Sequence, residues 1–260
     1  MKILFTGDIV GSCGRTMFLS SLPEIRLQND IDMVIINGEN SAHGRGISKI
    51  VADSFFDAGV DVITMGNHVW NNKDIFSILN ETSRVIRPAN LPQSNPGKGS
   101  VAVDIGGVKV GVINLLGRVY LDPCDSPFDA AIREVQNLKD EGCNIIIVDM
   151  HAEATSEKVA LGYFLDGQVS AVVGTHTHIQ TADEKILPKG CGYITDVGMT
   201  GAYHSVLGMD RKIIIDRFVT SLPQKFELAD GGAQFNGVIL DIDEKIGKCN
   251  SIKRLSFTDF

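Results

Sequence analysis

The chain has 260 residues, a formal net charge of −8 and five cysteines with no Cys-x-x-Cys pair. The length suits one α/β domain with a substantial core, so we expect residues 1–260 to form a single domain. The acidic balance disfavours a stable nucleic-acid complex, because such a surface needs basic residues that release counterions.

The scattered cysteines indicate a reducing compartment, and we expect the protein to be cytoplasmic. Asp8 interrupts the apolar run at the N-terminus, so no signal-peptide core is predicted. No apolar run is long enough to span a bilayer, and we therefore expect no membrane partner.

Short apolar runs rich in Val and Ile alternate with segments of helical spacing. The apolar runs predict five strands that are covered on both faces. They are Lys2–Thr6, Met33–Ile36, Asp61–Met65, Asn144–Val148 and Ser170–Val173. The spaced segments predict helices, with Thr155 or Ser156 as the N-cap of the third. The helices are Ile47–Ala58, Pro127–Glu141 and Ser156–Leu165. This alternation predicts an α/β fold.

Two stretches add more strands than a simple doubly wound sheet would contain. Ser100–Leu115 predicts a hairpin that turns at Gly106 and Gly107. The C-terminal region predicts strands at Gly192–Thr195, Gln234–Asp241 and Asn250–Leu255, and either a helix or a strand at Arg211–Val219. We therefore expect two packed sheets that are flanked by helices.

A residue able to bind a metal ion follows each of the five apolar runs. The set is Asp8, Glu39, Asn40, Asn67, His151, His176 and His178. We expect these side chains to converge, because the carboxyl ends of parallel strands meet at one edge of a sheet. Imidazole nitrogens suit Fe, Mn and Zn, and carboxylate and amide oxygens suit harder ions. The pattern predicts a pair of metal ions that binds a phosphoryl group and activates a water.

Each of these residues has an ordinary structural interpretation when it is taken alone. A strand-end aspartate such as Asp8 is usually a cap or turn residue, and Gly-Asn is a common turn pair. His151 alone fits a partly buried histidine with a hydrogen-bond partner. His176 and His178 are more specific, because residues i and i+2 of an extended segment face the same way. Their joint occurrence after five apolar runs favours the metal site.

The sequence resembles the calcineurin-like metallophosphoesterases, and more closely their YmdB-like subfamily of bacterial phosphodiesterases. The matching blocks are Gly7-Asp8, Asn37–Asn40, Gly66–His68, His151 and Gly174–His178, with Asn40–Gly46 and Asp196–Gly208 extending the match over nearly the whole chain. The first block lacks the superfamily's Asp-x-His pattern, and Glu39 followed by Asn40 stands where the superfamily has a bridging Asp. The YmdB-like subfamily shows both differences.

The resemblance implies a two-sheet β-sandwich in four αββα layers and a pair of divalent or mixed-valence metal ions. Fe or Mn is favoured, and Zn is the alternative. The first ion would be held by Asp8, Asn40 and His178, and the second by Asn67, His151 and His176. Glu39 would bridge the two ions. His68 would be the catalytic residue, facing the scissile phosphate without binding metal.

The resemblance also implies hydrolysis of a small phosphodiester, a 2′,3′-cyclic nucleotide, to a nucleoside monophosphate by attack of a metal-bound hydroxide. His68 would protonate or hydrogen-bond the departing ribose oxygen. Three alternatives stay open: a phosphomonoesterase or nucleotidase on the same site, a regulatory protein of RNA metabolism with incidental catalysis, and a structural metal site. The last fits poorly, because structural zinc sites are closed tetrahedra. Whether the chain forms a homo-oligomer is also open.

Two glycine-rich loops add candidate residues at the rim of the site. His43 and Arg45 follow Glu39, and Arg45 is either a phosphate contact or a solvated loop residue. His204 is a candidate for substrate contact, support of the site or subunit contact. Trp70 is expected to pack rather than to stack on a base, because it begins a helix-like segment.

Overall fold

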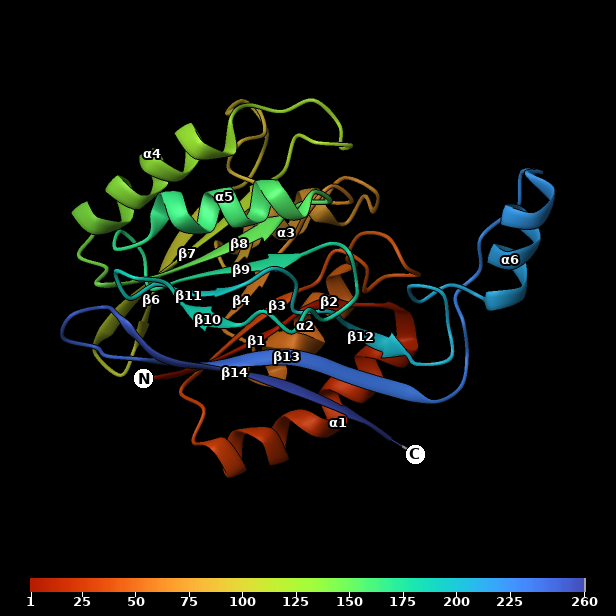
Figure 1. Ribbon diagram of the computed structural model, residues 1–260, viewed down its shortest axis with the longest axis horizontal. Coiled ribbons are helices and arrows are strands. Elements are labelled where there is room, and N and C mark those ends of the chain that lie inside the picture. Colours follow the sequence, from red (N-terminus) through yellow and green to blue (C-terminus); the bar gives the residue numbers. More distant parts are fainter. Residues whose placement is uncertain (260) are drawn as a thin grey trace.

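The structure is a computed structural model that describes residues 1–259, and it consists of two β-sheets stacked face to face with helices outside them (Figure 1). In these residues the first sheet has eight strands in the order β2-β12-β13-β1-β3-β4-β5, with β14 paired to β13. The second sheet has six strands in the order β10-β11-β9-β8-β7-β6. The predicted four-layer αββα sandwich is confirmed.

The strands include every one that the sequence predicts, together with four short ones that it does not. The first sheet comprises β1 (Lys2–Thr6), β2 (Asp8–Ile9), β3 (Met33–Asn37), β4 (Val62–Thr64), β5 (Val85–Ile86), β12 (Met199–Ala202), β13 (Ala233–Ile242) and β14 (Cys249–Thr258). The second comprises β6 (Ser100–Ile105), β7 (Val108–Leu116), β8 (Ile145–His151), β9 (Ala171–Thr175), β10 (Lys185–Ile186) and β11 (Gly192–Ile194). The unpredicted β2, β5, β10 and β12 have two to four residues each, too few for a sequence pattern to develop.

Three helices cover the outer face of the first sheet, two cover the outer face of the second, and one stands apart from both. The first sheet is covered by α1 (Gly11–Asn29), α2 (Lys49–Asp57) and α3 (Ile75–Glu81), and the second by α4 (Pro127–Asp140) and α5 (Thr155–Leu165). The sixth, α6 (Arg211–Thr220), resolves the helix-or-strand alternative in favour of a helix. None of these helices has the length and apolar character needed to cross a bilayer.

The sequence missed one long helix, and one capping prediction is wrong. Helix α1 was not predicted because Pro23 lies inside it and interrupts the helical signal. Helix α5 begins after Ala154, whose side chain cannot cap it, so the prediction of Thr155 or Ser156 as N-cap is wrong.

The core explains why the predicted strands are apolar on both faces. In β1, Leu4 points to the helices that cover the first sheet, whereas Ile3 and Phe5 point into the layer between the sheets. Val110 and Ile147 reach the same layer from the second sheet. In strands buried on two sides most polar side chains lie near the strand ends, and this positions the site.

Candidate metal centre

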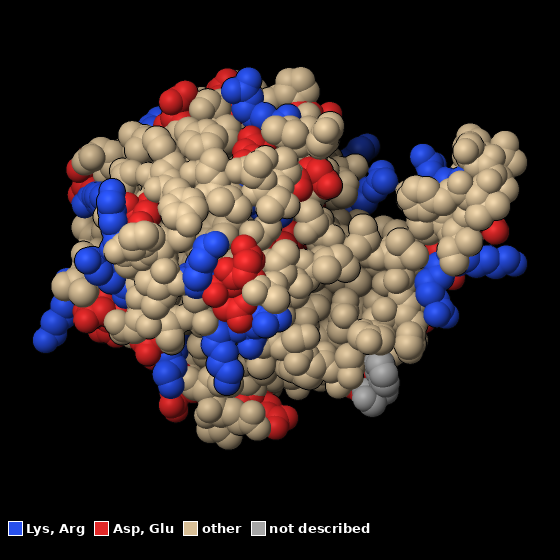
Figure 2. Space-filling model, in the orientation of Figure 1, with Lys and Arg blue, Asp and Glu red and all other residues tan. Residues whose placement is uncertain are grey.

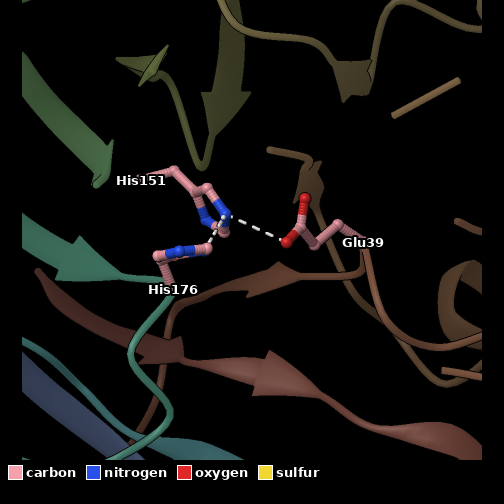
Figure 3. A group of neighbouring side chains, drawn as sticks. All are labelled: Glu39, His151 and His176. Atoms are coloured by element: carbon pink, nitrogen blue, oxygen red, sulfur yellow. Dashed lines mark hydrogen bonds and ion pairs between the residues drawn. The ribbon is translucent and has the colours of Figure 1, made fainter. Parts of the chain in front are cut away.

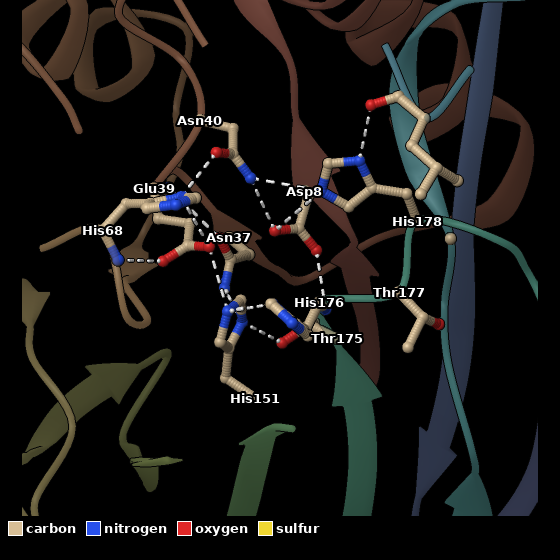
Figure 4. A network of polar contacts seen from close by, with 12 residues as sticks. Asp8, Asn37, Glu39, Asn40, His68, His151, Thr175, His176, Thr177 and His178 are labelled. Carbon is tan, nitrogen blue, oxygen red and sulfur yellow. Dashed lines mark hydrogen bonds and ion pairs between the residues drawn. The ribbon is translucent and has the colours of Figure 1, made fainter. Parts of the chain in front are cut away.

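The seven predicted metal ligands come from the ends of strands in both sheets. β1, β3 and β4 are parallel neighbours in the first sheet, and β8 and β9 are parallel neighbours in the second. The structure brings the side chains that follow these strands into one network of contacts (Figure 4). The sequence analysis placed all the ligands at the edge of a single sheet. The correction is that the ligands come from the strand ends of two stacked sheets.

One group of side chains surrounds the Nε2 atom of His151. Glu39 Oε1 lies 2.9 Å from this nitrogen, Asn67 Oδ1 3.0 Å and His176 Nδ1 3.1 Å. Figure 3 shows how Glu39 and the two imidazoles face one another. A ring nitrogen carries at most one proton, so it cannot satisfy three acceptors at once. The arrangement is that of donor atoms converging on a cation.

Glu39 gives a second indication that a cation belongs here. Its Oε1 atom is buried and accepts no hydrogen bond of good geometry, although His151 lies close. A buried carboxylate oxygen without a hydrogen bond is costly unless a positive charge offsets it. One ligand atom each from Glu39, His151 and His176 lies within 4.8 Å of the others, so the three residues fit one metal ion.

A second group adjoins the first around Asp8. Its Oδ1 atom lies 3.1 Å from Asn40 Nδ2 and 3.6 Å from His178 Nε2, and these two nitrogens are 3.2 Å apart. Its other oxygen, Oδ2, accepts a hydrogen bond of 3.1 Å from the backbone N–H of His176. Asp8 therefore ties the second group to the first.

His68 lies beside both groups. Its backbone N–H donates to Glu39 Oε2 at 2.9 Å, and its Nδ1 lies 3.0 Å from Asn40 Oδ1. The imidazole is 27% exposed, whereas the side chains of Glu39 and Asp8 are almost fully buried. His68 is thus fixed by the cluster and still reachable from solvent.

A buried polar chain sets the protonation of His151. Thr175 donates its hydroxyl hydrogen to Asp149 Oδ1 at 2.7 Å, so Thr175 Oγ1 can only accept from His151 Nδ1, which lies 2.9 Å away. Asp149 also accepts from Thr64 and Asn37. The proton of a neutral His151 is therefore held at Nδ1, and the Nε2 lone pair faces the cluster, as metal-binding histidines require.

His176 and His178 adopt backbone conformations unusual for histidine. Their φ angles are +97° and +67°, and the segment after β9 bends instead of continuing as a strand. The prediction that an extended segment turns both imidazoles the same way is wrong. The bend sends His176 to His151 and His178 to Asp8, so the pair serves both groups. Such strained conformations cluster at functional sites.

A buried ion pair holds this bend in place. Lys158 and Asp196 lie 2.7 Å apart, and both side chains are almost fully buried. Asp196 Oδ2 also accepts hydrogen bonds from the backbone N–H and the hydroxyl of Thr177, between the two histidines. His178 Nδ1 in turn donates to the carbonyl of Leu207 at 3.1 Å, which leaves its Nε2 facing Asp8.

The pKa shifts of Glu39, His151 and His176 indicate that the buried carboxylates of the cluster need a positive charge beside them. Burial would raise the pKa of Glu39, but the His151 and His68 imidazoles hold it well below its usual value. Burial would lower the pKa of His151, yet Glu39 and Asp8 raise it to about 9. Burial and the His151 charge lower the pKa of His176 to about 3. The cluster thus retains a proton on His151, at the position where a cation would replace it.

Gly66 lets the first group close. A Cβ at this position would collide with Glu39 Oε2 and with the His151 ring. Any larger residue would therefore separate the carboxylate from the imidazole, which explains the glycine before Asn67.

The rim candidates lie at the surface. His43 and Arg45 are exposed in the turn after Asn40, and Gly44 between them packs near Leu228. His204 is exposed, with its ring 5.0 Å from that of Tyr203. Trp70 stacks on Phe76 with ring centroids 5.7 Å apart, which agrees with the expected packing role.

Sequence reasoning did not assign roles to the polar residues behind the ligands: Asp149, Thr175, Thr64, Lys158 and Asp196. A signal existed for Asp149, since it is a charged residue inside an apolar strand, two positions before His151 and so on the same face. No local pattern distinguishes Lys158, which pairs with Asp196 across the fold.

Comparisons with known proteins find relatives that match nearly the whole chain. The model of the YmdB-like protein family matches residues 4–255. The chain is 49% identical to the 2′,3′-cyclic-nucleotide 2′-phosphodiesterase of Bacillus subtilis, over 100% of this chain and 98% of that protein. A solved structure described as a novel phosphatase from Mycoplasma pneumoniae has a TM-score of 0.93 and 36% identity, covering 99% of this chain and 93% of that one.

A more distant structure shares only the fold. The NAD nucleotidase of Haemophilus influenzae superposes with a TM-score of 0.62 at 14% identity, over 98% of this chain and 55% of that one. At this identity the likeness concerns the arrangement of sheets and helices.

Proposed function

Because the chain belongs to the YmdB-like protein family, we propose that it is a metal-dependent phosphodiesterase that hydrolyses 2′,3′-cyclic nucleotides to nucleoside monophosphates. The observation that carries the proposal is the set of three acceptor atoms around His151 Nε2, one of them a buried Glu39 oxygen without a hydrogen bond. The name of the Bacillus subtilis relative supports the substrate class.

The two groups of side chains divide the metal ligands between them. We assign Asp8, Asn40 and His178 to one ion and Asn67, His151 and His176 to the other, with Glu39 between them. When bound, two such ions supply a water of lowered pKa and neutralise charge on the phosphoryl oxygens. The mixture of nitrogen and oxygen donors favours Fe or Mn, with Zn as the alternative.

Asn40 links metal binding to the state of His68. In the structure its amide nitrogen faces Asp8 and its oxygen faces His68. Of the two amide atoms of Asn40, only the oxygen can bind a cation. Metal binding would therefore turn the amide and set its N–H₂ against His68 Nδ1. His68 would then keep its proton on Nε2. That proton is available to the departing ribose oxygen, which is the role of a general acid.

A substrate panel tests the proposal. The protein, loaded with Mn²⁺ or with Fe²⁺, is given 2′,3′-cyclic AMP, 3′,5′-cyclic AMP, a linear dinucleotide and 5′-AMP. We expect turnover of the 2′,3′-cyclic diester to exceed that of the other three, with one nucleoside monophosphate as product. Preference for 5′-AMP would contradict the proposal and establish the alternative of a phosphomonoesterase or nucleotidase.

That alternative has its own support in the comparisons. The Mycoplasma pneumoniae structure is described as a phosphatase. The same metal ligands would also serve hydrolysis of a monoester. The substrate panel therefore distinguishes the two activities, whereas the metal site does not.

Two further expectations accompany the proposal. We propose that residues 1–260 act as one domain, because the layer between the sheets contains Phe5 from one sheet and Ile147 from the other. We also propose that the enzyme acts in the bacterial cytoplasm. All five cysteines are free, which suits a reducing compartment.

A further inference from the structure

Residues 211–226 form an arm that stands away from the two sheets. The arm consists of α6 and the segment that follows it, and Figure 1 shows it projecting beyond the body of the molecule. Its two ends meet at its base, where Asp210 N–H donates to the carbonyl of Glu227 at 2.9 Å and Met209 bridges to Leu228. The arm is therefore a defined projection and not a loose loop.

The arm exposes an apolar stripe. Ile215, Phe218 and Val219 follow the i, i+3, i+4 spacing of one helix face, and Leu222 lies just past the end of α6. Phe218 is 80% exposed and Val219 is 78% exposed. The one buried residue of α6 is Ile214. A surface helix normally turns such a stripe toward a core, and here the stripe is exposed to solvent.

A short helix with an exposed apolar stripe needs a packing partner to be stable. α6 has ten residues, and isolated helices of that length are marginal in water. Most of the stability of a helix in a protein comes from packing its apolar face. Since the described part of this copy leaves the stripe exposed, we propose that a second copy of the chain covers it, so that each arm packs on the body of its partner in a symmetric dimer.

The opposite net charges of the arm and of the rest of the chain favour a second copy as the partner. The arm carries Arg211, Lys212, Arg217 and Lys225 against Asp216, a net charge of +3, so the remainder of the chain stands at −11. Figure 2 shows Lys and Arg side chains on the arm and at its base. A basic arm with an apolar stripe complements an acidic body, and complementary charge favours this pairing over contact between two arms. A closed symmetric dimer uses both arms at once.

The base of the arm also borders the metal centre. The Leu207 carbonyl accepts from His178, and Gly44 lies near Met209 and Leu228. The arm that makes the proposed contact therefore begins beside the loop that holds His178.

Sedimentation velocity of the full-length protein over a range of concentrations tests the proposal. We expect the wild type to form a dimer. The variant Phe218→Lys/Val219→Lys should raise the dimer dissociation constant by about 30-fold or more, the factor for a hot spot at the centre of an interface. The matched control is Leu27→Lys/Ile50→Lys, which adds the same charge at helix positions that are 83% and 82% exposed. This control should associate as the wild type does.

Salt and hydrogen exchange complete the test. Raising the salt concentration from about 0.1 M to about 1 M should weaken association, because it screens charge between arm and body. Amide exchange at residues 213–220 should slow on association. A wild type that stays monomeric, an arm variant that associates normally, a control that dissociates equally, or exchange that does not slow would each overturn the proposal. Far-UV circular dichroism of both variants checks that they are folded.

Discussion

The two halves of the proposed metal centre are held by different kinds of structure. His151 is fully buried, and its Nδ1 atom leads through Thr175 to Asp149, all of them on neighbouring strands. His178 is partly exposed, and its Nδ1 atom is held by the carbonyl of Leu207 in a loop. The first half is fixed by the packed sheets, whereas the second depends on a loop at the base of the arm. We therefore expect the His151 half to bind metal more tightly.

Glu39 belongs to both halves, and its replacement should have the largest effect. Glu39→Gln keeps the size of the side chain but removes the negative charge between the two groups. We expect turnover to fall by about 10³-fold, because metal ions stabilise the charge of the transition state by several kcal/mol. We also expect much of the bound metal to be lost. Steady-state kinetics and metal analysis measure both effects. A variant with full turnover would remove Glu39 from its bridging position.

His68 separates turnover from metal binding. We expect His68→Ala to lower turnover by about 10²-fold, at the lower end of the usual contribution of a general acid, while both metal ions stay bound. The measurement pairs kcat with metal content for the same preparation. Loss of a metal ion in this variant would identify His68 as a ligand and contradict its assigned role.

Thr175 tests the half that the sheets hold. Thr175→Val preserves shape and removes the hydroxyl that fixes the proton on His151. Replacing such an outer partner weakens metal affinity by about 10–100-fold, and we expect this loss for one ion only. The control is Thr6→Val, which alters a buried threonine whose hydroxyl has no hydrogen-bond partner. Metal titration followed by calorimetry should leave the control unchanged.

Gly208 tests the half that the loop holds, and its effect should be the smallest. Its φ is +91°, and an added Cβ would lie 2.7 Å from Val10 Cγ1, so Gly208→Ala should shift the neighbouring Leu207 carbonyl. Strain of about 1 kcal/mol corresponds to about fivefold weaker binding of the ion near His178. Gly107→Ala is the control, because its φ is +90° and its surroundings are open. Equal losses in Thr175→Val and Gly208→Ala would contradict the comparison of the two halves.

Strands with a continuous apolar pattern could be predicted from the sequence. Strands that depend on a partner distant in the sequence could not. Val- and Ile-rich runs located the ends of β3 to within one residue and those of β8 to within three, because burial on both faces leaves a continuous apolar signal. The two-residue strand β5 forms through its partner β4, and no local pattern encodes it.

The same division holds at the site. The polar residues after the strands were visible as Asp8, Glu39 and His151. The bend at His176 and His178 was not, because Asp196 and Lys158 stabilise it from other parts of the chain.

The central claim is that these strand ends hold two metal ions, and a crystal structure of the metal-loaded protein with anomalous scattering measures it directly. We predict two peaks about 3.5–4 Å apart, one beside Asp8 and His178 and one beside His151 and His176, with Glu39 between them. A single peak, or none after loading with Mn²⁺ and with Fe²⁺, would contradict the claim.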